Sequence, residues 1–131
     1  MERLYLTKII KHMETSHVSE KAKIGKNVKI GHFCIIEDDV EIGDNVTIEL
    51  RENTIIGESC YLDSKVSSSG QCKVGNNVTL RYETILARGV YVGDNSYLCP
   101  RVMTNNLDDE KNSVGGAKIG KNCFIGTHSV I

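Results

Sequence analysis

Charged side chains that could do chemistry recur in this sequence at one constant interval. Lys65, Glu83 and Arg101 follow one another at this spacing, and Asp63 and Arg81 form a second pair at the same interval. A carboxylate in such a column could accept a proton as a general base, and the alternating charges could hold a polar substrate. The same pattern is also typical of a solvated ladder of ion pairs. Both interpretations stay open at this point.

The histidines and cysteines give no pattern of metal ligands. No two of the four His have a ligand spacing such as HxxxH on a helix, so we expect no metal site. The five Cys are an odd number, and the chain has neither a signal peptide nor an apolar run long enough to span a bilayer. This favours a reducing compartment, and we expect a cytoplasmic protein with no membrane insertion.

Length and charge exclude several classes of protein. The chain has 131 residues, which is enough for one domain but too short for a kinase core or an eight-fold α/β barrel. The net charge is −1 and the pI is about 6.4. There is thus no bulk positive charge to favour binding to nucleic acid or to an anionic membrane.

An aliphatic residue recurs every six positions along most of the chain. Sixteen of the 17 positions on this register are Val, Ile or Leu, and the exception is Ser68. The register shifts once and is interrupted once, and its members are Val18, Ile24, Ile30, Ile36, Ile42, Ile48, Ile56, Leu62, Ser68, Val74, Leu80, Leu86, Val92, Leu98, Ile119, Ile125 and Ile131. Eight of the 12 Gly directly follow an aliphatic of this register, and Asn recurs two residues further on.

A period of six is neither helical nor a simple strand alternation. It predicts a short strand followed by a corner, and Asn tolerates the left-handed backbone that a tight corner needs. Three such sides would close one triangular coil, and the coils would stack as parallel strands around a narrow aliphatic core. Cys34, Cys60, Cys72 and Cys123 fall on the small inward position, where they are expected to be buried hydrophobes. Cys99 replaces a Gly and is expected to be exposed.

This repeat resembles the hexapeptide-repeat, left-handed parallel β-helix. The resemblance implies an all-β fold of about six triangular coils over residues 17–131, and it alone supplies the left hand, since the general crossover rule favours the right. Residues 1–16 have near-helical apolar spacing and are expected to cap the first coil. We place a corner bulge at 49–55 and an extended loop near 104–118. The loop would hold about three extra residues, or nine if one side is skipped.

Within this family, the sequence most resembles one branch, the nucleotide-sugar N-acetyltransferases of surface-polysaccharide synthesis. Residues 29–46 look like the first coils of that branch, and residues 92–106 look like its motif of a Gly-Pro strand followed by a Phe-Thr-Asn loop, with Cys99 for Gly and Met103 for Phe. The resemblance implies acetyl-CoA as acyl donor and a homotrimer with sites between subunits. It also implies that the chain lacks its last coil and cap.

The same resemblance assigns candidate site residues. Arg81, Tyr82 and Glu83 stand where other members have a Gln-Asn-Asn run, so Glu83 could be the base. The remaining assignments are substrate binding by Arg81, Tyr82, Arg101, Thr104, Asn105 and Asn106, and cofactor binding by Lys118 and Lys121.

The function expected from this resemblance is acyl transfer from acetyl-CoA to the amine of a nucleotide-linked amino sugar. One alternative is an O-acetyltransferase that acts on a sugar hydroxyl, for which His32 is the best-placed base. His32 would lie about four coils, or roughly 19 Å, from the Asn105 loop within one subunit. A non-catalytic β-helix that serves in assembly is the other alternative.

Overall fold

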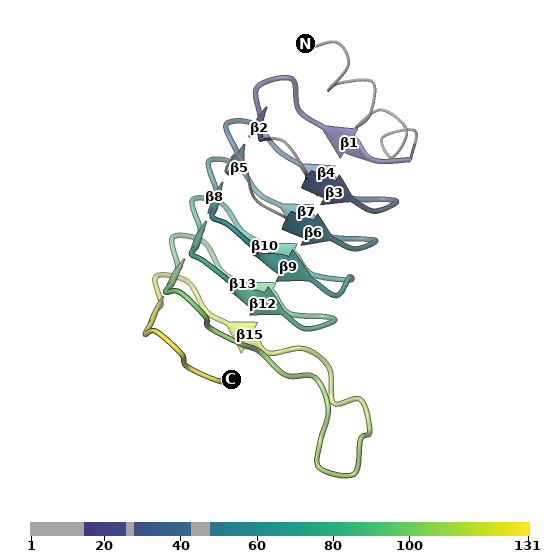
Figure 1. Cartoon of the computed structure of the whole chain (residues 1–131), viewed down its shortest axis with the longest axis vertical. Helices are drawn as coiled ribbons and strands as arrows, with labels where there is room; N and C mark the ends of the chain where they lie inside the picture. Colours follow the sequence, from purple (N-terminus) through teal and green to yellow (C-terminus); the bar gives the residue numbers. More distant parts are fainter. Residues whose placement is uncertain (1–14, 26–27, 43–47) are drawn as a thin grey trace.

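The chain folds into short strands that wind around a common axis (Figure 1). The computed structural model describes residues 15–25, 28–42 and 48–131. One sheet contains β1 (His17–Val18), β4 (Ile35–Ile36), β7 (Ile55–Ile56), β10 (Lys73–Val74), β13 (Tyr91–Val92) and β15 (Lys118–Ile119). A second contains β2 (Lys23–Ile24), β5 (Glu41–Ile42), β8 (Tyr61–Leu62), β11 (Thr79–Leu80), β14 (Tyr97–Leu98) and β16 (Phe124–Ile125). The third contains β3 (Val28–Ile30), β6 (Ile48–Leu50), β9 (Ser67–Ser68) and β12 (Ile85–Leu86).

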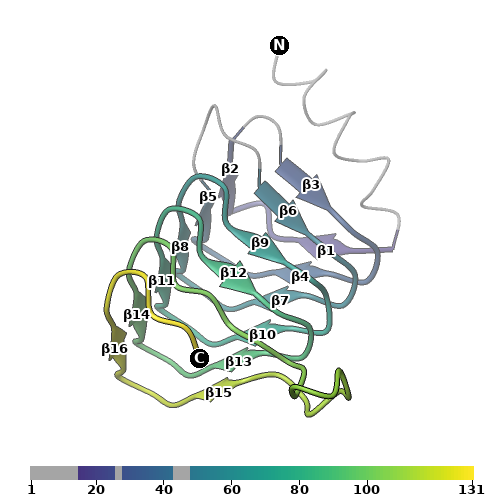
Figure 2. The ribbon, with the colours of Figure 1, turned by 60° about the horizontal axis from the view of Figure 1, so that its bottom comes forward.

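From β1 to β11, each strand pairs in parallel with the strand three further along the chain. Lys73 pairs with Tyr91 and Thr79 with Tyr97, so one coil takes three steps of the six-residue repeat. The three sheets form the three sides of a parallel β-helix, which confirms the stacked triangular coils (Figure 2). The left hand of the coil stays a prediction from the resemblance. None of the described segments forms a helix that is long and apolar enough to cross a membrane.

The corners use left-handed backbone, as the recurring Asn predicts. Asn53, Asn77, Asn95 and Asn122 all have φ between 58° and 61°. A carbonyl of the neighbouring coil accepts a hydrogen bond from each corner amide, as in the bond from the Asn77 N–H to Glu58 O at 2.8 Å. The expected N-terminal cap helix lies almost entirely outside the described residues, because only residues 15 and 16 of that segment are described.

The interruptions of the repeat differ from the sequence-based expectation. Ile24 pairs with Ile42 at an offset of 18, whereas Ile30 pairs with Leu50 at an offset of 20. The two-residue shift therefore falls between Ile42 and Ile48, and the predicted bulge at 49–55 is wrong. It was misplaced because Ile48 and Leu50 are both buried, so either residue could continue the aliphatic register.

The late interruption contains nine extra residues. Val92 pairs with Ile119 at an offset of 27, which exceeds one coil by nine. Met103 bridges to both Ile85 and Val130, so the chain completes the third side before the insertion begins. The insertion is the loop over 104–117, which projects from the corner between the third side and the first (Figure 1).

The inward aliphatic residues form one narrow core. Ile36, Leu62, Leu80 and Leu98 are fully buried, in agreement with the six-residue register. Cys34, Cys60 and Cys72 are buried too, as expected, and burial raises the pKa of the Cys60 thiol to about 11. Such a thiol stays protonated at neutral pH and is a poor nucleophile.

The burial of Cys99 and of Cys123 differs from the prediction. Cys99 is buried, with only 8% of its surface exposed, so its expected exposure is wrong. Its side chain packs with the core cluster although it stands at a position where other coils have Gly. Cys123, on the last described coil, is only partly buried.

Ser68, the exception in the aliphatic register, belongs to a buried hydroxyl pair. Its Oγ lies 2.7 Å from Thr54 Oγ1, which donates to Arg51 O at 2.7 Å. Ser68 Oγ also accepts a hydrogen bond from the Gly70 N–H at 3.1 Å. Because the Thr54 hydroxyl hydrogen is bonded to Arg51 O, the Ser68 hydroxyl must be the donor to Thr54 Oγ1. Each hydroxyl of the pair therefore has hydrogen-bond partners within the protein and needs no water.

We expect Thr54→Val to lower the free energy of unfolding by about 1–2 kcal/mol, because the Ser68 hydroxyl loses its acceptor inside the core. Adding Ser68→Ala to Thr54→Val should then cost less than Ser68→Ala does in the wild type. Urea denaturation of the two single variants and the double variant measures this coupling. Thr79→Val, on an outward position, is the control and should change stability by less than about 0.5 kcal/mol. Strictly additive effects of the two substitutions would contradict the pairing.

At two of the glycines that follow an inward aliphatic, Gly75 and Gly93, the next coil is too close to admit a side chain. A Cβ on Gly75 would lie 2.9 Å from the backbone N of Asp94, and one on Gly93 would lie 2.6 Å from the carbonyl carbon of Gly120. Neither glycine has a positive φ, so close approach and not backbone conformation excludes a side chain. The next glycine of this column, Gly120, has only Cys123 Sγ near its Cβ position, at 3.8 Å.

Candidate functional site

The column of alternating charges lies on one corner, as its constant spacing predicts. Glu83 Oε1 is 4.0 Å from Lys65 Nζ, and Glu83 Oε2 is 3.2 Å from Arg101 Nε. The backbone of this corner is also bonded from coil to coil, since the Arg101 N–H donates to Tyr82 O at 2.7 Å. Both carboxylate oxygens of Glu83 therefore face a cation from an adjacent coil.

A second polar chain runs beside this ladder. Arg81 Nε donates to Asp63 Oδ2 at 3.2 Å, and Arg81 Nη1 lies 2.5 Å from the hydroxyl of Tyr97. The hydrogen bonds to Tyr97 and to Asp63 raise the pKa of Arg81 above its ordinary value, so its charge is fixed.

The ring of Tyr82 lies near both cations of the ladder through Glu83. Lys65 Nζ and Arg101 Cζ lie 5.6 Å and 5.9 Å from its centroid, within cation–π distance. Together these side chains form what we call the corner cluster, made of Asp63, Lys65, Arg81, Tyr82, Glu83 and Arg101. It brings together the candidates Arg81, Tyr82, Glu83 and Arg101 between the second side and the third.

The inserted loop begins at the other end of the third side. The Thr104 hydroxyl accepts from the Ala87 N–H at 2.7 Å and donates to Ile85 O at 3.0 Å, so it fastens the loop to the coil. Asn105 Oδ1 accepts from the N–H groups of Asn106 and Leu107, at 2.9 Å and 3.3 Å. Thr104 and Asn105 thus use much of their hydrogen-bonding capacity to hold the loop.

The remainder of the loop is also held by its own contacts. Leu107 and Ser113 form an antiparallel bridge. Asp108 accepts hydrogen bonds from Asn112 and from the Glu110 N–H, and these bonds, the Asn112 N–H foremost, lower the pKa of the Asp108 carboxyl. The loop is a defined projection from the coil, and Asn106 lies within its first strand-like arm.

The structure places the two candidate lysines away from the corner cluster. Lys118 lies on β15 of the first side, and Lys121 lies in the corner between β15 and β16. Both side chains are exposed. They therefore could meet the corner cluster only across a boundary between two subunits or through a long ligand.

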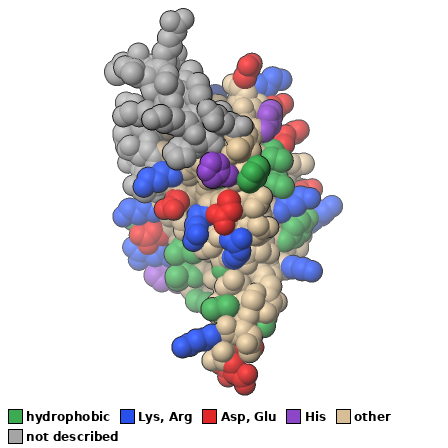
Figure 3. Space-filling model, turned by 90° about the vertical axis from the view of Figure 1, so that its right-hand side faces the viewer, with side chains coloured by type: hydrophobic (Ala, Val, Ile, Leu, Met, Phe, Trp, Pro, Cys, Tyr) green, Lys and Arg blue, Asp and Glu red, His purple; other side chains and the backbone are tan. Residues whose placement is uncertain are grey.

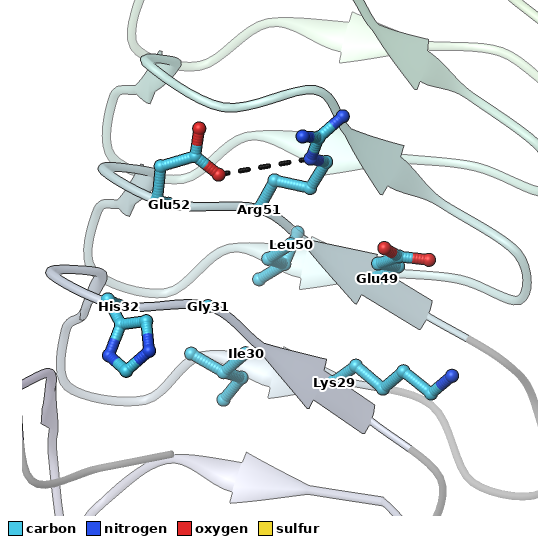
Figure 4. Close-up of a pocket in the computed structure, with 8 residues that line it drawn as sticks. All are labelled: Lys29, Ile30, Gly31, His32, Glu49, Leu50, Arg51 and Glu52. Atoms are coloured by element: carbon cyan, nitrogen blue, oxygen red, sulfur yellow. Dashed lines mark ion pairs between the residues drawn. The ribbon is translucent and has the colours of Figure 1, made fainter.

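His32 occupies the corner from which the loop projects, but at the other end of the β-helix. Its Nδ1 is 2.7 Å from Thr15 Oγ1. His32 lines a pocket of about 420 Å³ with Lys29, Ile30, Gly31, Glu49, Leu50, Arg51 and Glu52. Figure 4 shows that these side chains come from β3 and β6 and from the corners that follow the two strands, and Figure 3 shows acidic and basic groups near a histidine on the face that it draws. Sequence reasoning found His32 here and missed the rest of this pocket.

An ion pair across two coils stabilises the edge of this pocket. Arg88 Nη1 donates to Glu52 Oε1 at 2.8 Å and to Ser69 O at 3.2 Å, and it passes over Gly70. A Cβ on Gly70 would lie 2.9 Å from Arg88 Nη1. Glu52, Gly70 and Arg88 follow one another at the spacing of one coil, but the wrongly predicted bulge at 49–55 left Glu52 outside the regular coils.

The hydrogen bond from Arg88 is the main cause that lowers the pKa of Glu52. Because this pKa is lower in the folded state, the ion pair stabilises the fold above the ordinary pKa of a glutamate. That contribution is lost as the pH falls through the folded-state value. We expect Arg88→Gln to raise the pKa of Glu52 toward the ordinary value, as measured by NMR titration of its carboxyl carbon. The stability difference between wild type and variant should vanish at low pH, and a constant difference would contradict the ion pair.

Among the described residues, no group of three His, Cys, Asp or Glu side chains could hold a metal ion. The chemistry available at the corner cluster is that of cations, carboxylates and an aromatic ring. Such groups bind polar substrates and accept protons.

Parallel strands stacked at a six-residue period, with a polar corner and one inserted loop, define a β-helix protein of the hexapeptide-repeat class. Comparison with known proteins agrees with this class. Residues 7–106 match the family described as GMPPB C-terminal domain, and residues 116–131 match the hexapeptide repeat of succinyl-transferase. The chain therefore belongs to the family described as GMPPB C-terminal domain, and it is built of hexapeptide repeats.

Two of three similar curated proteins are named for acyl transfer to UDP-linked sugars. The chain is 30% identical over 120 residues to the bifunctional protein GlmU of Xylella fastidiosa, an alignment that covers 82% of the chain and 26% of that protein. It is 31% identical over 125 residues to the acyl-[acyl-carrier-protein]–UDP-N-acetylglucosamine O-acyltransferase of Rickettsia typhi, which covers 83% of the chain and 44% of that protein. A stretch of 48 residues is 48% identical to the UDP-3-O-acylglucosamine N-acyltransferase of Dechloromonas aromatica and covers 35% of the chain and 14% of that protein. The chain thus spans less than half the length of these relatives.

Proposed function

We propose that this chain transfers an acyl group, with acetyl-CoA as donor, to the amine of a nucleotide-linked amino sugar. The observation that carries the proposal is the corner cluster, where two carboxylates, three cations and an aromatic ring meet on the scaffold of an acyltransferase family. Relatives named for acyl transfer to UDP-linked amino sugars support the choice of substrate class. Synthesis of surface polysaccharide in the cytoplasm is the setting that we propose.

In the proposed reaction, the nitrogen of the amino sugar attacks the carbonyl carbon of the thioester. The carbon–sulfur bond then breaks, and the thiolate leaves with the electron pair of that bond. Glu83 accepts the proton that the amine loses, and this proton passes to the thiolate to give free CoA. Arg81 and Arg101 would hold the anionic part of the sugar nucleotide against Tyr82, so that much of the rate would come from positioning.

The inserted loop and the late coils would complete the site. Asn106 and the exposed amides of the loop could contact the sugar, and Lys118 and Lys121 could pair with the phosphates of CoA. Because these lysines lie on a different side of the coil, we expect a homotrimer in which one subunit supplies the corner cluster and its neighbour supplies the lysines.

Transfer to a hydroxyl is a second candidate, because one relative is an O-acyltransferase. It would place the base at His32. A non-catalytic role in assembly is the third. The family that matches residues 7–106 is described as a C-terminal domain, and this description names no acyl transfer.

The decisive experiment is a thiol-release assay on the full chain with acetyl-CoA and a panel of UDP-linked sugars. We expect release only with acceptors that carry a free amine, and saturable binding of acetyl-CoA by calorimetry. Release with UDP-N-acetylglucosamine, which offers only hydroxyls, would favour O-acylation. Absence of both binding and release would leave the assembly role and contradict the proposed reaction.

A further inference from the structure

The pocket between β3 and β6 has a composition that suits a charged ligand. Lys29, His32 and Arg51 bring three nitrogen-bearing side chains to its wall, and Glu49 and Glu52 bring two carboxylates (Figure 4). Its volume of about 420 Å³ lies in the usual range of small-molecule sites.

One of the two carboxylates is already neutralised from outside the pocket. Glu52 Oε1 is 2.8 Å from Arg88 Nη1, and its Oε2 is 3.8 Å from Arg51 Nε. Over the part of the chain that the structure describes, neither Lys29 nor Glu49 forms an ion pair within 4.0 Å. Lys29, His32 and the outer nitrogens of Arg51 can thus serve an anionic group, and Glu49 can accept hydrogen bonds from hydroxyls.

Phe33 adds an aromatic ring beside this pocket at a cost in backbone strain. Its φ is 57°, a conformation that is a genuine outlier for a bulky residue, and its surface is 62% exposed. The equivalent corner positions of the next three coils hold Asn53, Gln71 and Gly89, and of these Asn53 and Gly89 suit this backbone better. The Phe33 ring gains little from burial, and it lies 6.2 Å from the ring of His32, which lines the pocket. The backbone of Phe33 is strained, and its exposed ring does not offset this strain by packing in the core. We take this as an indication that the ring contacts another molecule.

We propose that this pocket is a second ligand site, which binds a nucleoside diphosphate. The phosphates would face Lys29, His32 and Arg51, the base would stack on Phe33, and Glu49 would accept a hydrogen bond from the ribose. The corner cluster is built around β8, β11 and β14 at a different corner. The inference therefore goes beyond the proposed acyl transfer and does not depend on it.

The test is calorimetric titration of the full chain with UDP and, separately, with inorganic pyrophosphate. We expect saturable binding of both, with Arg51→Gln and Lys29→Gln each lowering both affinities about tenfold, the scale of one charge-assisted hydrogen bond. Phe33→Asn should lower the affinity for UDP about tenfold and leave pyrophosphate binding unchanged. The same variant should raise the midpoint of thermal unfolding, because Asn tolerates the left-handed backbone.

Two control variants separate this pocket from other cationic surfaces. Lys73→Gln makes the same charge change on the exposed face of β10 and should leave both affinities unchanged. Equal losses in Lys73→Gln and Arg51→Gln would show non-specific attraction and overturn the proposal. Loss of UDP binding in Arg81→Gln, with none in Arg51→Gln, would place the nucleotide at the corner cluster; this too would overturn the second site, although it would support the proposed acyl transfer. Absence of saturable binding would overturn the second site as well.

Discussion

Gly93→Ala should lower the free energy of unfolding by about 2–3 kcal/mol, the scale of an overpacked core. The new methyl group would lie 2.6 Å from the carbonyl carbon of Gly120 and from the backbone N of Lys121. Both are backbone atoms of the adjacent coil, which is held at strand spacing by the bond from the Gly93 N–H to Ile119 O at 2.8 Å. The methyl group can be accommodated only if the two coils move apart, and that movement weakens the parallel pairing. Urea denaturation followed by circular dichroism measures the change.

Gly120→Ala is the matched control for this prediction. It makes the same substitution in the same column, but its Cβ would meet only Cys123 Sγ, at 3.8 Å. We expect this variant to be neutral or to gain about 0.4–1 kcal/mol, because alanine reduces the entropy of the unfolded chain. If both variants lose the same stability, a general cost of removing glycine would explain the column better than the contact between coils.

Glu83→Gln should lower the turnover of acyl transfer by about 100-fold or more, the usual contribution of a general base. The substitution keeps the size of the side chain and removes its ability to accept a proton. Because Lys65 and Arg101 are partly exposed partners, loss of these ion pairs should change stability by less than about 1 kcal/mol. Steady-state kinetics with the amine acceptor, together with thermal unfolding, separates a loss of kcat from a loss of folded protein.

Glu41→Gln provides the control for charge removal. Glu41 forms a similar exposed ion pair with Lys23, at 3.8 Å, on the second side of an early coil. Its kinetic constants should match those of the wild type. Turnover that persists in Glu83→Gln would show that Glu83 only forms ion pairs with its neighbours and is not the base. His32, or water held by the loop, would then be the remaining candidates for the base.

Two features of the structure bear on both proposals. The corner cluster and the inserted loop lie at opposite ends of the third side, and Met103, which is 45% exposed, lies between them. An acceptor that touches both would lie along this side. The pocket at Lys29 and Arg51 lies on earlier coils, so ligands at the two places would not compete for the same side chains.

The six-residue register, read from the sequence alone, determined the kind of fold. The burial of an inward aliphatic such as Leu62 or Leu80 can be predicted from its place in the six-residue repeat, because every repeat has the same strand and corner. The charge ladder through Glu83 followed as well, because no insertion separates its members and three repeats return the chain to the same corner.

The tertiary structure decided which outward side chains meet across the interruptions. Burial of both Ile48 and Leu50 concealed where the register shifts, and the misplaced shift assigned the residues from Ile48 to Thr54 to the wrong neighbours on the preceding coil. Glu52 and Arg88 are two regular coils, or 36 residues, apart, and they meet because Gly70 on the coil between them has no side chain. The strain at Phe33 is likewise invisible in a list of residue types, since it arises from the corner at which the coil places that ring.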